Sequence, residues 1–498
     1  MRVSTVHPIS PTTGLLTRLL VAAAVIVLLV VQGRALILFF QHAKLALDFP
    51  YTLNYGEGPL LDQAVRLQRG EEIYRVDLSI PPYTISNYPP LYALIQMPFV
   101  SVFGAAFWYG RLISVVSVIV SAVFVGLTMH AITRDALAGL IAALMLPAMP
   151  YIFSWSALAR IDSLALAFAW AGLFALVQGR GKRRGFVAGV ILLACAVYTR
   201  QSYLLAAPLA AFGWLWGQKQ RMNAMIFIVY FAALVLGVFA LLTVVTQGGI
   251  FFHVITANVN TLESRIIDFY LDEIMRNLPI FLGATAVMPL IGIFADRRLW
   301  WFASPYLFGA VITALTIVKV GSDVNYLYEL SAAFALSAGG VVAWSRRFPL
   351  LRVGLLLILA WAVIMAFDLS AAKYQPILVE RIDDAPQMNQ LIQFINQTDA
   401  PIIADEHMAL LTLLDRPILI QPFEMSQLAA VGVWDQAPFL ENLRHGDYPF
   451  VLIYQPYRNP NLRRERWTNA MLREINNHYR PLMQTAETTV YQYFHMEN

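Results

Sequence analysis

The chain has 498 residues, of which 58% are hydrophobic and only 13% are charged. Soluble domains carry about 25% charged residues, so this composition excludes an ordinary soluble protein. The net charge of +4 is too small, and the charges too dispersed, to indicate a nucleic-acid partner. Because Cys195 is the single cysteine, intramolecular disulfides and thiolate zinc sites are excluded as well.

Apolar runs of about 20 residues recur along the chain, and each is long enough to cross about 30 Å of hydrocarbon. The first run follows a short basic segment and is longer than a signal-peptide core, so we expect it to remain as a membrane anchor. About eleven spans are predicted, at approximately 15–40, 107–130, 136–154, 162–178, 186–200, 203–217, 223–246, 278–295, 299–318, 326–344 and 350–368. The predicted fold class is therefore a polytopic α-helical membrane protein.

Basic residues mark every second connection between these spans. They are Arg134, the run 179–184, Lys219 with Arg221, Arg297 with Arg298, and Arg346 with Arg347. The positive-inside rule places these connections in the cytoplasm, so we expect a cytoplasmic N-terminus and an extracytoplasmic C-terminus in the inner or plasma membrane. Three larger segments then lie outside, at about 41–106, about 247–277 and from about 370 to the end.

The last outer segment differs in pattern from the spans. Short apolar runs at 401–404, 417–420 and 450–454 alternate with helix-like stretches, which is typical of a small α/β domain with a short sheet. We therefore predict two parts, a transmembrane domain over 1–370 that includes the outer loop 41–106, and an extracytoplasmic α/β domain over 371–498.

The first outer loop holds a candidate general base. Glu57 lies between Gly56 and Gly58, where the backbone can approach a substrate closely and a carboxylate can accept a proton. The alternative reading is a solvated acid in a turn. Asp48 and Asp62 are the fallback bases, although Asp62 is also placed to face solvent on an amphipathic helix.

Further polar residues recur at the outer ends of the spans, where an ionisable group is costly unless it faces a cavity or a partner. They are Arg160 with Asp162, Arg200 with Gln201, and Lys319 with Asp323, Asn325, Tyr326 and Glu329. Structural ion pairs are the alternative for these groups. Two other charged segments, 260–273 and 405–407, are read mainly as a surface-helix face and as a weak acid–base or metal pattern.

The order of these motifs resembles the GT-C glycosyltransferases, most closely the bacterial relatives of protein O-mannosyltransferase and lipid A aminoarabinose transferase. The resemblance covers roughly residues 15–370. It rests on the outer-loop acid, the turn at 70–74, the segment Asn87–Tyr92, Arg160-x-Asp162, the run Tyr198–Gln201 and Asn325-Tyr326-x-x-Glu329. Many relatives carry two adjacent acids or an aspartate in the first loop, whereas this chain has Glu57 between glycines.

The resemblance implies inverting transfer of a sugar from a polyprenyl-phosphate donor to a glycan, lipid or protein acceptor on the outer face. Glu57, or else Asp62, would be the general base, and Lys319, Arg200 or Arg160 would receive the lipid phosphate. The other motif positions, Tyr88, Asp162, Gln201, Asn325, Tyr326 and Glu329, are expected to bind substrate. The basic residues could act without a tightly held metal, although some relatives use a divalent cation, so a divalent cation stays open as a cofactor. The expected partners are the lipid-linked donor, the acceptor and membrane lipids.

Two other classes of protein fit the same pattern. A transporter of lipid-linked sugars would also need a large apolar scaffold with interior charges, but its polar groups should lie deep within several spans. A non-catalytic scaffold would use the tail of about 130 residues as a binding module. The clustering of charges at the outer ends favours the transferase.

Overall fold

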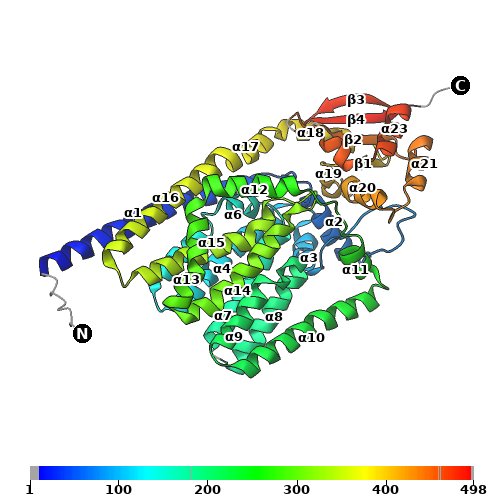
Figure 1. Cartoon of the computed structure of the whole chain (residues 1–498). Helices are drawn as coiled ribbons and strands as arrows, with labels where there is room; N and C mark the ends of the chain where they lie inside the picture. Colours follow the sequence, from blue (N-terminus) through cyan, green and yellow to red (C-terminus); the bar gives the residue numbers. More distant parts are fainter. Residues whose placement is uncertain (1–10, 180, 458, 460, 495–498) are drawn as a thin grey trace.

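The computed structural model describes residues 11–494 with the exception of 180, 458 and 460. Helices make up nearly all of it, and a single small sheet lies far from the N-terminal end of the first helix (Figure 1). The bundle consists of α1 (Pro11–Asp48), α4 (Trp108–Thr133), α5 (Ala136–Met145), α6 (Pro150–Ser156), α7 (Ile161–Gly179), α8 (Arg183–Thr199), α9 (Ala206–Gly217), α10 (Arg221–Val245), α13 (Pro279–Phe294), α14 (Arg297–Leu315), α15 (Tyr328–Ser345) and α16 (Pro349–Leu369).

Every predicted span falls on a helix of this bundle, which confirms the polytopic membrane class. Among the described residues, seven helices are long and apolar enough to cross a membrane, or up to nine if each of two bent pairs counts as one span. One bent pair is α5 with α6, which turn by 56° where Pro147 and Pro150 cannot supply backbone N–H groups. The number of eleven spans stays a prediction, because α8 and α9 are shorter than this measure requires.

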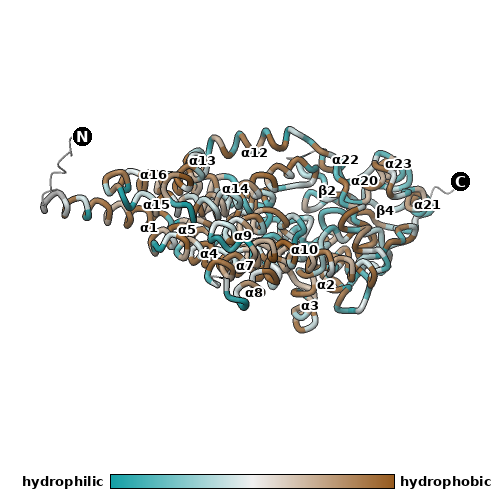
Figure 2. The backbone as a smooth tube through the Cα atoms, turned by 60° about the horizontal axis from the view of Figure 1, so that its bottom comes forward, coloured by the Kyte–Doolittle hydropathy of each residue, from teal (hydrophilic) through white to brown (hydrophobic). Residues whose placement is uncertain are grey.

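The apolar residues concentrate in the bundle, and polar segments gather toward the C-terminal part (Figure 2). Because successive helices run in opposite directions through the bundle, all the basic connections lie at one of its ends. The beginning of α7, the end of α8 and the loop between α14 and α15 lie at the other end. The orientation of these ends relative to the membrane stays a prediction, and Arg180 of the basic run 179–184 is outside the described residues.

The two outer segments that interrupt the bundle are mainly helical. They contain α2 (Glu57–Gln68), α3 (Leu91–Phe103), the single turn α11 (Gly249–Phe251) and α12 (Ser264–Asn277). α12 meets α13 at a bend of 94° and exposes one charged and apolar face. The reading of segment 260–273 as a surface helix is therefore supported from Ser264 onward.

The C-terminal part is a small α/β unit, as expected. It contains α17 (Gln375–Asp383), α18 (Ala385–Asn396), β1 (Ile402–Ala404), α19 (Ala409–Leu413), α20 (Pro422–Ala430), α21 (Ala437–His445), β2 (Phe450–Tyr454), α22 (Leu462–Arg466), α23 (Asn469–His478), β3 (Tyr479–Thr485) and β4 (Thr488–Tyr493). The sheet has the order β1-β2-β4-β3, in which β1 and β2 are parallel and β4 is antiparallel to both of its neighbours. The register pairs Ile403 with Val451 and Leu452 with Val490.

The apolar run 417–420 is not a strand of this sheet, contrary to the prediction. Ile420 instead forms an isolated parallel bridge with Tyr83 of the outer loop. The Tyr83 amide donates to the Leu419 carbonyl at 2.7 Å, and the Gln421 amide donates to the Tyr83 carbonyl at 3.0 Å. The run is apolar because it packs against another segment of chain, not because it enters the sheet.

This contact joins the outer loop to the core of the C-terminal part. Leu78, Tyr83 and Ile85 are buried in the same cluster as Trp434, whose indole N–H donates to the Leu78 carbonyl at 2.9 Å. The chain also continues without a linker from α16 through a π-helical turn into α17. The boundary near residue 370 thus stays a prediction, since the apolar core of the C-terminal part includes residues of the first outer loop.

Candidate active site

A cavity of about 650 Å³ lies where the outer ends of the bundle helices meet the first outer loop and the C-terminal part. Its walls come from the start of α2, the loop before α3, the ends of α7 and α8, the connection from α14 to α15, and the segments around α20 and α22. Six of the predicted site residues line it: Tyr88, Arg160, Arg200, Gln201, Lys319 and Tyr326. The structure therefore brings together residues that are up to 238 positions apart, from Tyr88 to Tyr326.

Arg160 and Lys319 are cations of this cavity that are not engaged in an ion pair. Both are half-buried, and neither forms an ion pair with any residue that the structure describes. The Arg160 guanidinium lies over the Trp155 ring at 5.4 Å, and its buried Nε has no hydrogen-bond partner within the described part of the chain. Two half-buried cations that are not held in ion pairs are available to an anion that enters the cavity.

Gly56 allows Arg160 to enter the cavity. A β-carbon at Gly56 would lie 1.2 Å from Nη1 of Arg160, so any other residue would displace the guanidinium. The backbone of Gly56 is helical, with φ at −74°, and so the close approach is the reason for glycine here. The sequence analysis singled out this glycine for the acid beside it, whereas its contact is with an arginine.

Arg200 is held in place by a buried network. Its guanidinium pairs with Asp162, donates to the Asn325 carbonyl at 3.0 Å and lies 4.5 Å from the centre of the Tyr326 ring. Asp162 also accepts hydrogen bonds from the Trp155 indole at 2.6 Å and from the Asn325 amide at 3.2 Å. Asp162 and Asn325 do not line the cavity; they orient Arg200 and compensate its charge.

Tyr88 and Gln201 supply neutral hydrogen-bonding groups to the cavity. Gln201 donates to the Asn87 carbonyl at 2.9 Å, and the Tyr74 hydroxyl donates to the Tyr88 carbonyl at 2.7 Å. Burial raises the pKa of Tyr88, which keeps its phenol protonated at physiological pH. These contacts fix the loop before α3 against the end of α8.

Glu57 does not line the cavity. Its fully buried carboxylate accepts two hydrogen bonds from Arg111, both at 2.9 Å, and one each from the amides of Leu53 and Ala159, both at 2.7 Å. All the strong acceptor directions are thus occupied by the protein itself. This geometry gives no support to Glu57 as the general base. Its hydrogen bonds instead hold the first outer loop, α4 and the turn before α7 together.

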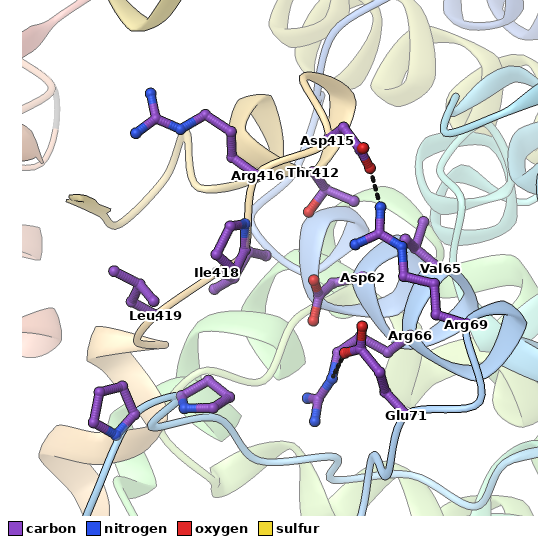
Figure 3. Close-up of a pocket in the computed structure, with 13 residues that line it drawn as sticks. Asp62, Val65, Arg66, Arg69, Glu71, Thr412, Asp415, Arg416, Ile418 and Leu419 are labelled. Carbon is purple, nitrogen blue, oxygen red and sulfur yellow. Dashed lines mark hydrogen bonds and ion pairs between the residues drawn. The ribbon is translucent and has the colours of Figure 1, made fainter. Parts of the chain in front are cut away.

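Three other acids named in the sequence analysis also lie away from the cavity. Asp48 is exposed at the end of α1 and pairs with Lys44. Glu329 is buried in α15, and neither carboxylate oxygen has a partner among the described residues. Asp62 lines a second, separate cavity on another face of α2 (Figure 3).

Three acids that line the cavity are Asp323, Glu424 and Glu465. One oxygen of Asp323 accepts from the Val324 amide at 2.7 Å and from the Tyr270 hydroxyl at 3.2 Å. Glu424 accepts from the Tyr55 hydroxyl at 2.7 Å. Burial raises the pKa of both carboxyl groups, which makes each a stronger base once ionised.

The sequence analysis missed Glu424, Arg466 and Arg111. Asp323 was recognised beside Lys319, but nothing local distinguishes Glu424 or Arg466 from surface residues of the C-terminal part. Arg466 lines the cavity, pairs with Glu406 and lies 4.7 Å from the centre of the Tyr55 ring. Arg111 is the fourth residue of α4, and an ionisable residue within a predicted span is itself an indication of a buried partner or a site.

The segment Asp405–His407 is structural. Asp405 accepts from the Trp467 indole at 3.0 Å, and Glu406 pairs with Arg381 and Arg466. Burial lowers the pKa of His407 to about 4, so the ring is neutral. Within the described residues, no group of three or more histidines, cysteines or acids is arranged to hold a metal ion, and we derive no step through a metal.

Residues 87–245 match the sequence model of the family described as dolichyl-phosphate-mannose-protein mannosyltransferase. The matched region contains Tyr88, Arg160, Arg200 and Gln201 of the cavity, and also Arg111. No curated protein sequence matches the chain.

The fold is similar to that of several solved membrane enzymes. ArnT from Cupriavidus metallidurans in the apo state has a TM-score of 0.59 at 14% identity, with 97% of this chain and 98% of that chain covered. The same protein bound to undecaprenyl phosphate has a TM-score of 0.60 at 14% identity, with 93% and 97% covered. The apo oligosaccharyltransferase from Archaeoglobus fulgidus has a TM-score of 0.52 at 10% identity, with 93% and 75% covered.

The family match covers residues 87–245, and the fold likeness extends over nearly the whole chain. Both findings agree with the resemblance to the GT-C glycosyltransferases seen in the sequence.

Proposed function

We propose that this protein transfers a sugar from a polyprenyl-phosphate donor to an acceptor at the outer face of the membrane. The observation that carries the proposal is the pair of cations not engaged in ion pairs, Arg160 and Lys319, in one cavity at the end of the bundle. A phosphate between the sugar and its lipid would supply a counter-charge. Two proteins with a similar fold have lipid phosphates in their structures, undecaprenyl phosphate in ArnT and a dolichol-phosphate in archaeal AglB.

In this proposal the cations act on the leaving group. As the acceptor oxygen attacks the anomeric carbon, the bond from that carbon to the phosphate oxygen breaks and negative charge builds on the lipid phosphate. Arg160 and Lys319 stabilise this charge, while Asp162 keeps Arg200 oriented on the same wall. Attack from the face opposite the phosphate inverts the anomeric configuration.

The base that takes the acceptor proton is proposed to be Asp323 or Glu424 in place of Glu57. Both carboxyl groups line the cavity, and burial raises the pKa of each. An unengaged oxygen on either would accept the hydroxyl proton as the new glycosidic bond forms. Glu57 lacks that freedom, because four protein hydrogen bonds occupy its carboxylate.

Binding of undecaprenyl phosphate to the purified full chain tests the donor assignment. We expect Arg160→Gln and Lys319→Gln to weaken binding by about tenfold or more each, because each removes a charged hydrogen-bond donor worth roughly 1.5–3 kcal/mol. Arg298→Gln, an exposed arginine at the opposite end of the bundle, is the matched control and should bind normally. Equal binding by all three variants would exclude the cavity as the phosphate site.

A transfer assay separates the candidate bases. The rate at which membranes consume a lipid-linked sugar is measured for Asp323→Asn and for Glu424→Gln. The variant that lacks the general base should be slower by about 100-fold or more, since general-base catalysis contributes about 10²–10⁴-fold. Binding of undecaprenyl phosphate should persist in both. If the purified protein moved the lipid-linked sugar across a vesicle membrane without transferring it to an acceptor, a transporter of lipid-linked sugars would be favoured instead.

A further inference from the structure

A second cavity of about 360 Å³ lies on another face of α2 from the proposed active site. The helix separates the two cavities by its periodicity, because positions i, i+3, i+4 and i+7 share a face. Pro59, Leu60 and Gln63 line the active-site cavity, whereas Asp62, Val65, Arg66 and Arg69 line the second cavity. The opposite wall is formed by the outer-loop prolines 81–82 and by segment 412–419 of the C-terminal part.

Two polar side chains of buried residues in this cavity form no hydrogen bond with a described residue. Asp62 is 6% exposed, and its carboxyl group is close enough to Arg66 and Arg69 for an electrostatic interaction but forms neither a hydrogen bond nor an ion pair with a described residue. Figure 3 shows that this carboxyl group points into the space between α2 and the segment with Ile418. The hydroxyl of Thr412, 3% exposed, is likewise without a partner among the described residues. Groups of this kind are costly unless a ligand or water satisfies them.

The three arginines of the cavity already have partners within the protein. Nε of Arg66 lies 3.4 Å from Glu71, and Arg69 forms an ion pair with Asp415 (Figure 3). Arg416 donates to the carbonyls of Ile395 and Thr398 at 3.0 and 2.9 Å. Because each of the three guanidiniums is engaged by a carboxylate or by backbone carbonyls, none is held ready for a phosphate, and we do not assign a phosphate site here.

A metal ion and a purely apolar ligand also fit poorly. Asp62, Glu71 and Asp415 are not arranged as a metal-binding group within the described residues. One side of the cavity offers paired carboxylates and guanidiniums, which both donate and accept hydrogen bonds. The other side is a strip of Pro81, Pro82, Ile418 and Leu419. A pyranose ring has the matching distribution, with hydroxyl groups at its edge and C–H groups on its face.

We infer that this cavity is an accessory carbohydrate site, which binds one neutral sugar residue beside the active site. Its volume lies at the lower end of the range of about 300–1,000 Å³ found for ligand cavities. Asp62 and Thr412 hydrogen-bond the sugar hydroxyls, and the proline strip packs against the ring. The inference rests on the proposed glycosyl transfer for the origin of that sugar, a non-reacting unit of a glycan acceptor.

Saturation-transfer NMR on the full chain tests the site with sugars of one ring size and different charge. The probes are methyl α-D-mannopyranoside and methyl β-D-glucopyranoside as neutral sugars, with glucosamine and glucuronate as the cationic and anionic comparisons. The protein is held in lipid nanodiscs, because glycoside detergents would compete for the site. We expect at least one neutral glycoside to bind, and Asp62→Asn and Thr412→Val each to weaken that binding by about tenfold.

Glu72→Gln is the matched control, since Glu72 is exposed, lies near the cavity and does not line it. It should bind the glycoside as the unmodified chain does. The inference is overturned if neither neutral glycoside binds or if only a charged sugar binds. It is also overturned if Glu72→Gln weakens glycoside binding as much as Asp62→Asn and Thr412→Val do. Undecaprenyl phosphate binding is measured on the same samples. It should be unchanged in Asp62→Asn, so that failure of the accessory site is distinguished from failure of the donor site.

Discussion

Single side chains divide this site into groups that can meet a substrate and groups that only hold the wall together. The Glu57 carboxylate is saturated by Arg111 and two backbone amides, so its charge supports three segments of chain. Arg160 lies one residue beyond Ala159, which donates to Glu57, yet its guanidinium is left without a counter-ion among the described residues. Saturated charges stabilise structure, whereas unsaturated ones are available to a ligand.

The Glu57→Gln substitution should lower stability before it affects chemistry. It leaves the guanidinium of Arg111 buried beside a neutral amide, and breaking a buried ion pair from one side costs about 3–5 kcal/mol. We expect a clear drop in the Tm of the purified protein, measured by tryptophan fluorescence. Asp48→Asn, which removes an exposed acid paired with Lys44, should leave the Tm unchanged. A stable Glu57→Gln variant that binds donor but transfers no sugar would return Glu57 to the role of base.

The Gly56→Ala substitution should weaken donor binding while leaving the stability of the protein almost unchanged. The helical backbone of Gly56 accepts alanine, but the added methyl group would lie 1.2 Å from Nη1 of Arg160 and force the guanidinium out of position. We expect undecaprenyl phosphate to bind about tenfold more weakly with little change in Tm. Gly33→Ala in α1, where nothing lies within 4 Å of the added carbon, is the control. Unchanged binding by Gly56→Ala would show that the position of Arg160 does not matter.

Among the elements, α2 is shared by both cavities. One face of this helix contributes to the active-site wall and another to the accessory cavity. Gly58 packs against Ala409 of α19, because a β-carbon added at Gly58 would lie 2.9 Å from the Ala409 β-carbon. A single helix of 12 residues thus contributes side chains to both cavities. The apolar residues of α2 pack against α3, the start of α4 and Ala409 of the C-terminal part.

The carboxyl group of Asp62 should make stability depend on pH. Burial raises its pKa to about 7 from an ordinary value near 4, so between these values the unfolded chain loses a proton that the native protein retains. Stability therefore falls as pH rises from about 4 to about 7 and is constant above, by up to about 4 kcal/mol from this group. Asp62→Asn removes the effect. Its Tm should match that of the unmodified chain at pH 4 and exceed it at pH 8, whereas equal Tm values at both pH values would contradict the shift.

At the scale of the whole molecule, the active site is formed between the bundle and the C-terminal part. Arg160, Arg200 and Lys319 come from the helix ends, while Glu424 and Arg466 come from beyond residue 420. Tyr55 connects the two through its hydrogen bond to Glu424 and its ring contact with Arg466. The C-terminal part is therefore a wall of the cavity, which argues against a tail that only presents a binding surface.

Residues 371–498 expressed alone should not reach a stable fold. Their apolar core is completed by Leu78, Tyr83 and Ile85, and the Trp434 indole loses its acceptor at Leu78 when the outer loop is missing. We expect poorly dispersed NMR spectra for the isolated fragment. Fusion of residues 73–90 to the fragment should improve them, and a well-dispersed spectrum without that segment would show that the C-terminal part is independent.

The sequence predicted the helices well and the site only in part. Spans are determined by local composition, since every run of about 20 apolar residues must satisfy its backbone hydrogen bonds internally. Five of the six cavity residues recognised in the sequence lie at or beside the ends of bundle helices, where the same argument makes polar groups conspicuous, whereas Tyr88 of the first outer loop came from the resemblance. Run 417–420 was misread as a strand because burial by Tyr83 and burial in a sheet select the same apolar residues.

The sequence by itself determined the membrane class, the helical segments and the end of the bundle where the charges gather, because hydropathy and charge act over neighbouring residues. The tertiary structure alone decided which charges are left free. Glu57 is neutralised by Arg111, Asp162 by Arg200, and Arg160 and Lys319 have no acidic partner in the described residues. A charge becomes a ligand site only if the folded chain fails to compensate it, and that depends on residues that are distant in sequence.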